Sequence, residues 1–385
     1  MFKKENRTWL IFILVYIFTY MCNAIYGTYI PVYLSGIGYN KTSIGILLSL
    51  APIIAIIVQP VWGILGDRAK AKNTILYILI LGSTMSILLF KLSTGFIFLS
   101  VAITIFTFFQ TSINPMTDAI TLEYSYSRKW KFGYIRLAGT LGFALMSALS
   151  GMLLAKGVSR IFYIYFDLGI TSLALAIFLP KVKGHQTKAK RVPVWVLLKD
   201  KKLLLLIIFS LILQITISYF GTFFGIYYQQ LGANGKLLGW AYFISSFSEV
   251  PFLLFSHKIL KKVKPEHALI FAGITAAIRW IILGTVSNIY IILASQVMHG
   301  LGFIIIMVTL ALYINEHAPQ ELKASGQALI GLVNAGAAKI IASLLGGYLS
   351  DSFGIRQMFI YNSILVVITV LTFGFIFYRN GRKLI

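Results

Sequence analysis

Long apolar runs alternate with short polar links along the whole of this 385-residue chain. An α-helix rises about 1.5 Å per residue, so about twenty apolar residues cross the roughly 30 Å hydrocarbon core of a bilayer. Runs of about this length fall at 8–33, 42–66, 73–91, 95–122, 132–155, 160–179, 203–230, 236–257, 267–285, 289–314, 325–350 and 356–378. The pattern predicts an all-α integral membrane protein with twelve transmembrane helices.

The composition agrees with this class and excludes others. Hydrophobic residues make up 58% of the chain and charged residues only 12%, whereas soluble domains average about 25% charged residues. The formal charge of +23 is spread over short links and forms no basic stripe, so we expect no nucleic-acid partner. The single cysteine, Cys22, excludes an intrachain disulfide and a thiolate metal cluster. The first apolar run, 8–33, is far longer than a signal-peptide core and is predicted to be a retained span.

The longest polar segment, 181–202, divides the twelve runs into two sets of six. It is predicted to be a cytoplasmic linker between an N-terminal half, 1–180, and a C-terminal half, 203–385. The two halves resemble one another, because three residues of the first half recur after a shift of 194 residues. These are Gly38, Asn40 and Gly45, which return as Gly232, Asn234 and Gly239. Two pseudo-symmetric six-helix halves are typical of secondary transporters, whose substrate site lies between the repeats near the bilayer midplane.

The distribution of basic residues predicts the orientation, because cytoplasmic loops carry the excess of Lys and Arg. With the N-terminus inside, 25 of the 34 Lys and Arg fall in cytoplasmic segments, 6 outside and 3 within spans. We therefore expect both termini and the linker in the cytoplasm, with the protein a multi-pass component of the cell membrane.

Six ionisable residues lie deep inside the predicted spans: Asp118, Arg136, Glu249, Arg279, His299 and Lys339. A lone charge at this depth costs a few kcal/mol, so it is rare unless it pairs, faces water or has a function. Asp118 and Arg136 flank the basic link 127–131 at similar depth and are predicted partners. Arg279 and His299 flank the external turn at Asn288 in the same way.

Two interpretations of these charges remain open. The two acids and two arginines could be ion pairs that only hold helices together, or they could handle substrate and protons, which we favour. Glu249, followed by the helix-bending Pro251, is the predicted proton carrier, paired with Arg279 and close to His299. Lys339 has no acidic partner on the seventh span, so it either holds an anionic substrate or reaches water.

The link between the second and third spans, Gly63-Ile-Leu-Gly-Asp67-Arg68-Ala-Lys70-Ala-Lys72, resembles the signature loop of the major facilitator superfamily. The resemblance implies that Gly63, Asp67 and Arg68 take part in conformational gating, with Asp67 interacting with a neighbouring helix end. The chain departs from the signature at Lys70, where the family has a glycine.

Within this superfamily the spans resemble the branch of lactose permease, nucleoside–proton symporters and phenylpropionate permeases. Asp118, Arg136, Gly139 and Gly142 are similar to the acid–arginine pair of the permease, and Glu249, Arg279 and His299 to its coupling group. The run from Gln296 to Gly300 is more like the nucleoside and phenylpropionate members. Phe143 replaces the sugar-stacking tryptophan, and Gly302 replaces the proton-carrying carboxylate, so proton coupling is expected to rest on Glu249 or Asp118. The resemblance implies a substrate site at Asp118, Arg136 and Phe143, to which Asn114 and Lys339 are added as polar candidates.

These observations predict a secondary active transporter that works by alternating access, importing a sugar, nucleoside or aromatic acid with a proton. We expect a monomer in the lipid bilayer that binds a small-molecule substrate, needs no cofactor or metal and is driven by the proton gradient. A proton-coupled drug or metabolite exporter is the alternative, although residues 132–155 lack the proline of the Gly-Pro motif common in exporters. A membrane sensor or enzyme is a further alternative, but no His and Asp cluster has ligand spacing.

Overall fold

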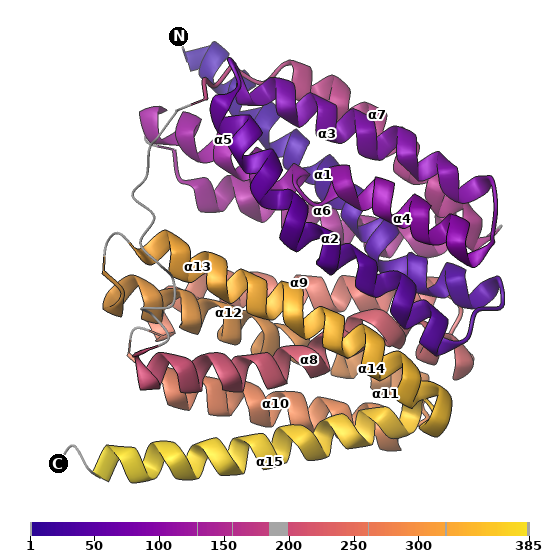
Figure 1. The fold of residues 1–385 in the computed structure, drawn as a ribbon, viewed down its shortest axis with the longest axis vertical. Helices are drawn as coiled ribbons and strands as arrows, with labels where there is room; N and C mark the ends of the chain where they lie inside the picture. The colour runs from indigo at the N-terminus through magenta and orange to yellow at the C-terminus, as the bar shows by residue number, and fades with distance from the viewer. Residues whose placement is uncertain are drawn as a thin grey trace. The chain divides into compact units, whose positions relative to one another are not determined.

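The computed structural model describes residues 2–128, 130–155, 157–184, 199–260, 262–319 and 322–382, and Figure 1 shows their fold. All regular elements in these residues are helices. They are α1 (Phe2–Gly36), α2 (Lys41–Arg68), α3 (Lys72–Ser86), η1 (Ile87–Lys91), α4 (Phe96–Gln110), α5 (Ile113–Arg128), α6 (Phe132–Leu153), η2 (Val158–Arg160), α7 (Ile161–Ile177), α8 (Lys201–Gln230), α9 (Gly235–Leu260), α10 (Pro265–Thr285), α11 (Ile289–Ser295), α12 (Met298–His317), α13 (Lys323–Gly331), the π-helix η5 (Leu332–Ala337), α14 (Ala338–Phe353) and α15 (Ile355–Arg382). Most of the predicted linker, 185–198, lies outside the described residues.

The prediction of twelve membrane spans is confirmed for the described part of the chain. Twelve helical stretches there are long and apolar enough to cross a bilayer, and each coincides with one predicted run. Three of these stretches contain more than one α-helix. The stretch Phe96–Tyr126 contains α4 and most of α5, Ile289–His317 contains α11 and α12, and Ser325–Phe353 contains most of α13, then η5 and α14.

The breaks in the fourth and tenth spans lie next to residues of interest. Between α4 and α5, Pro115 stands in the first turn of α5, where its missing N–H is tolerated and a helix can begin anew. Between α11 and α12 the break falls at Gln296 and Val297, two residues before His299 in the first turn of α12. Broken spans free backbone groups and redirect side chains, which makes them frequent components of transporter sites.

The chain forms two compact units. The first comprises Met1–Tyr39, Leu47–Ala189 and Asn234–Phe243, and the second comprises Asn40–Ile46, Lys190–Ala233 and Ile244–Ile385. The predicted division into halves at 181–202 stays a prediction. In the first unit α1 packs against α6 and α7, and α3 against α4 and α7. Its apolar core gathers buried side chains from several of these helices, among them Phe12, Tyr16 and Leu79.

The second unit is organised around α8 and α10. Figure 1 shows α8, α10 and α15 side by side, and α8 also packs against α14. Trp280 of α10 is fully buried, stacks on Phe359 of α15 and donates a 3.0 Å hydrogen bond to the Thr216 hydroxyl of α8. This bond satisfies the indole N–H, which would be costly to bury without a partner.

The sequence repeat has a structural basis. Gly38 and Gly232 each stand just after the end of a helix. Their φ angles are positive, 98° and 93°, which is the left-handed conformation that favours glycine. Asn40 and Asn234 both accept a hydrogen bond from a backbone N–H three residues later, as helix-capping residues do. At the third position both glycines allow close helix packing. A Cβ on Gly45 would collide with the carbonyl of Ser343, and one on Gly239 would lie 2.5 Å from the carbonyl of Ser147.

Candidate functional site

The first unit brings Asp118 of α5 and Arg136 of α6 together. Arg136 Nε lies 3.9 Å from Asp118 Oδ1, and the two side chains are 39% and 31% exposed. The predicted pairing is therefore present, at the long end of ion-pair distances. The exposure leaves both groups open to a polar solute.

Two tyrosines of α1 contact the pair of Asp118 and Arg136. Tyr16 is fully buried and donates a 2.5 Å hydrogen bond from its hydroxyl to Asp118 Oδ1. One turn later, the ring of Tyr20 lies under the Arg136 guanidinium, 4.5 Å from ring centroid to Cζ. Such a cation–π contact holds the arginine without using its hydrogen-bond donors. The sequence reasoning missed both tyrosines, although their i, i+4 spacing predicts that they share one face of α1.

Glycines of α6 allow α1 to reach the pair. A Cβ on Gly139 would lie 2.7 Å from the Tyr20 ring, and one on Gly142 would lie 2.6 Å from the Ile17 carbonyl. A Cβ at position 139 would displace the Tyr20 ring, and one at position 142 would displace the backbone of α1. These glycines are therefore part of what positions the tyrosines at Asp118 and Arg136.

The other predicted substrate residues of this unit lie near the pair by helix geometry. Asn114 stands one turn before Asp118 on α5, and Phe143 stands two turns after Arg136 on α6, so each shares a face with its charged neighbour. Both side chains are half-buried. Substrate binding by either residue stays a prediction.

The second unit joins Glu249 of α9, His299 of α12 and Arg279 of α10 into a chain. Glu249 Oε1 lies 3.4 Å from His299 Nε2, and Arg279 Nη1 lies 2.9 Å from His299 Nδ1. We predicted Glu249 and Arg279 as a pair, and the structure shows the imidazole of His299 bridging them. His299 is therefore the central residue of this cluster, because it contacts both Glu249 and Arg279.

The arginine determines which nitrogen of His299 carries the proton. A guanidinium has only donors, so Nδ1 beside Arg279 must accept and must be unprotonated. Neutral His299 therefore carries its proton on Nε2, which faces the carboxylate of Glu249. A second proton on the imidazole would place an N–H donor against the guanidinium, which disfavours imidazolium at this position.

Gln296 holds the far side of Arg279. Its Oε1 accepts a 2.5 Å hydrogen bond from Arg279 Nη2 and a 3.2 Å bond from the Ser245 hydroxyl. Its Nε2 donates to the carbonyl of Ile292 at 2.9 Å. The Arg279 guanidinium also lies 4.0 Å from the centroid of the Phe220 ring. The sequence reasoning placed Gln296 in a family motif but gave it no role, because its contacts come from other helices.

Gly300 allows α9 to approach α12 at this cluster. A Cβ on Gly300 would lie 2.3 Å from the carbonyl oxygen of Ser248 and 3.0 Å from the backbone nitrogen of Glu249. The Ser248 hydroxyl also accepts a 3.0 Å hydrogen bond from the Gly300 N–H. The contact between Glu249 and His299 therefore depends on the absence of a side chain at Gly300.

The predicted gating segment forms its own polar cluster at the C-terminal end of α2. Lys72 Nζ, at the start of α3, lies 3.4 Å from Asp67 and 3.0 Å from Glu123 of α5. Asp67 therefore contacts the beginning of the next helix, as the resemblance implied. Arg68 is exposed, and Gly63 has open space where a Cβ would stand, so the fold alone does not require glycine there.

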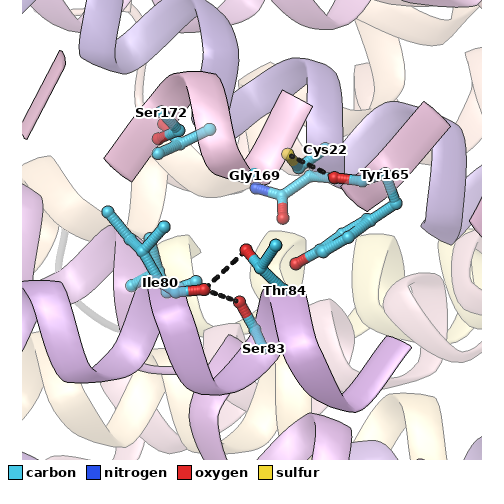
Figure 2. A pocket seen from close by; sticks show the side chains of 10 residues that line it. Cys22, Ile80, Ser83, Thr84, Tyr165, Gly169 and Ser172 are labelled. Atoms are coloured by element: carbon cyan, nitrogen blue, oxygen red, sulfur yellow. Dashed lines mark hydrogen bonds between the residues drawn. The ribbon is translucent and has the colours of Figure 1, made fainter. Parts of the chain in front are cut away.

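A small hollow between α1, α3 and α7 is lined by polar and small residues (Figure 2). Ser83 and Thr84 both donate to the carbonyl of Ile80, whereas the buried Ser172 hydroxyl has no hydrogen-bond partner among the described residues. The Cys22 thiol approaches the carbonyl of Tyr165 at 3.9 Å. These contacts are typical of helix packing rather than of a substrate site.

No group of three His, Cys, Asp or Glu that could hold a metal ion occurs in the described ranges of the chain. The remaining predicted residue, Lys339, is exposed and is the second residue of α14, which follows the π-helix η5.

A family model matches most of this chain, and known proteins resemble it in sequence and in fold. Residues 5–361 match the family model described as MFS_1 like. The chain is 25% identical over 335 residues to the maltose permease of Geobacillus stearothermophilus, covering 86% of this chain and 85% of the permease. It is 24% identical over 349 residues to the probable 3-phenylpropionic acid transporter of Escherichia coli (strain K12), covering 88% of this chain and 90% of the transporter. The crystal structure of nucleoside transporter NupG shares its fold, with a TM-score of 0.82 at 14% identity, covering 95% of this chain and 99% of that one.

Proposed function

The chain belongs to the MFS_1 like family, whose members are transporters and not enzymes, and from this premise we propose that the protein is a proton-coupled symporter of a small organic solute. It works by alternating access, and the proton gradient is its only energy source, without a cofactor. It is a multi-pass membrane protein. We further propose that it is a monomer in the cell membrane with both termini in the cytoplasm.

The chain of contacts from Glu249 through His299 to Arg279 is the observation that carries this proposal. The three side chains meet within 3.4 Å in a largely buried cluster, where Glu249 and His299 are 17% and 15% exposed. Because Arg279 disfavours imidazolium, an incoming proton goes to the carboxylate of Glu249. Protonation removes the negative charge that holds Nε2–H of His299, so it weakens the link between α9 and α12. A change in helix contacts that follows a change in protonation is what coupling requires.

The pair of Asp118 and Arg136 supports solute binding in the first unit. Its greater exposure and its tyrosine partners offer charged, hydrogen-bonding and aromatic groups to one solute. The names of the relatives favour the solute classes of sugars and aromatic acids, with nucleosides suggested by the structural neighbour. We therefore propose that the substrate binds at Asp118, Arg136, Asn114 and Phe143. We also propose that Gly63, Asp67 and Arg68 take part in conformational gating.

The test is solute-driven alkalinisation in energised vesicles that contain the protein. Maltose, uridine and 3-phenylpropionate are added in turn, and the external pH is followed together with accumulation of the labelled solute. Glu249→Gln keeps the size and hydrogen bonding of the side chain but cannot release a proton. We expect it to exchange solute across the membrane without accumulating it.

A matched control is Glu316→Gln, which removes an exposed carboxylate from the end of α12. It should accumulate solute as the parent does. If Glu249→Gln accumulates solute normally, coupling through Glu249 is wrong, and Asp118 or a sodium ion becomes the candidate. If solute accumulates in the parent without alkalinisation, proton coupling itself is wrong.

A further inference from the structure

Lys339 stands at the centre of its membrane span. The span runs over Ser325–Phe353, so fourteen residues separate Lys339 from either end. A charged side chain at this depth is costly unless it meets water, a counter-charge or a ligand. The π-helix Leu332–Ala337 ends just before it, and π-helical turns occur frequently at functional sites.

Lys339 lies on the protein-facing side of α14. On a helix with 3.6 residues per turn, the side chains three, four, seven and eleven positions later lie within roughly 60° of it. These are Ala342, Ser343, Gly346 and Ser350, and all four are buried. The opposite side of α14 carries the exposed Leu345 and Tyr348, which suit contact with lipid. Lys339 is nevertheless an exposed residue, and it stands on the protein-facing side of the helix.

The facing helix supplies no acid at this level. Asn334 accepts a 2.9 Å hydrogen bond from Ser210 of α8, and a Cβ on Gly346 would lie 2.6 Å from the Tyr219 ring. The two helices therefore run parallel, and Lys339 lies near the level of Gln214. Residues 211–218 of α8 contain no Asp or Glu. No carboxylate within the described ranges forms an ion pair with Lys339 at 4.0 Å or less.

Deep charges balance in the first unit but not in the second. Asp118 and Arg136 cancel, whereas Glu249 offsets only one of Arg279 and Lys339 when His299 is neutral. We propose that Lys339 binds the carboxylate of a small monoanionic substrate, so that the loaded second unit becomes neutral. This inference deepens the proposed transport function and rests on it. A neutral sugar would leave the excess positive charge uncompensated at the centre of the span.

Ligand-dependent heat stability of the purified full-length protein tests the inference without requiring transport. The probes are three acids and their neutral amides: lactate and lactamide, benzoate and benzamide, and 3-phenylpropionate and 3-phenylpropanamide. A ligand that binds the folded state raises the unfolding midpoint in proportion to its affinity. We expect at least one acid to bind about tenfold or more tightly than its amide, because a charged hydrogen bond contributes that much.

Lys339→Gln should remove this preference and Lys339→Arg should retain it. Lys236→Gln, which deletes an exposed charge at the start of α9, is the matched control and should retain it as well. The inference is overturned if the parent prefers no acid over its amide, or if Lys339→Gln keeps the preference. Failure of the proposed symport is recognised separately, by normal accumulation in Glu249→Gln vesicles, because binding in detergent does not depend on coupling.

Discussion

Replacing Gly300 by alanine should separate the two residues of the proposed proton site without changing either one. The new methyl group would lie 2.3 Å from the carbonyl oxygen of Ser248, and real Cβ contacts under 3.0 Å are essentially never seen. Because the obstacle is backbone, it cannot rotate away. The segment of α9 that carries Ser248 and Glu249 must therefore move away from α12 by about 0.7 Å or more.

This displacement is enough to break the contact between Glu249 and His299. At 3.4 Å it is already at the long end of hydrogen bonding, and a shift of about 0.7 Å lengthens it to about 4.1 Å. Losing a hydrogen bond to a charged group costs about 1.5 kcal/mol at the low end of the usual range, a factor of about ten in an equilibrium. Overpacking adds a loss of stability of about 1–3 kcal/mol.

Gly302→Ala is the matched control on the same helix. A Cβ on Gly302 would meet its nearest atom, the carbonyl oxygen of Ala272, at 4.0 Å, which is ordinary contact. The assay measures solute accumulation in energised vesicles and the heat-unfolding midpoint in detergent. We expect Gly300→Ala to accumulate about tenfold less solute and to unfold roughly 2–10 °C lower, with Gly302→Ala near the parent. Equal behaviour of the two variants would refute the role assigned to Gly300.

Three further predictions use the same purified protein. Tyr16→Phe removes the donor to Asp118 and should lower the free energy of unfolding by about 1.5–3 kcal/mol, so an unchanged midpoint would contradict the bond. Gly184→Ala would place a Cβ 2.5 Å from the backbone carbonyls of Asp67 and Ala69, at the end of α2, and should lower the midpoint, whereas Gly221→Ala, with open space, should not. Cys22 is 5% exposed, so a maleimide should label it only on unfolding, and rapid labelling of the native protein would contradict its burial.

The sequence by itself determined the fold class and the positions of the spans. Apolar runs must be about twenty residues long to satisfy a bilayer, so length and hydropathy located all twelve spans within a few residues. The repeat was also readable, because Gly38 and Gly232 need positive φ and Asn40 and Asn234 cap helices. Such local requirements act within a few residues, so they can be recognised directly in the sequence.

The depth of the charged residues in the spans could be predicted from the sequence for the same local reason, but their partners could not. Depth along a span follows from residue counting, whereas rotation about the helix axis is decided by packing against other helices. Only the tertiary structure therefore shows that His299 lies between Glu249 and Arg279. It also shows that Tyr16 contacts Asp118, which is 102 positions away in the sequence. It also decided that Gly300 rather than Gly302 is indispensable to close packing, because two glycines in one helix differ only in what faces them.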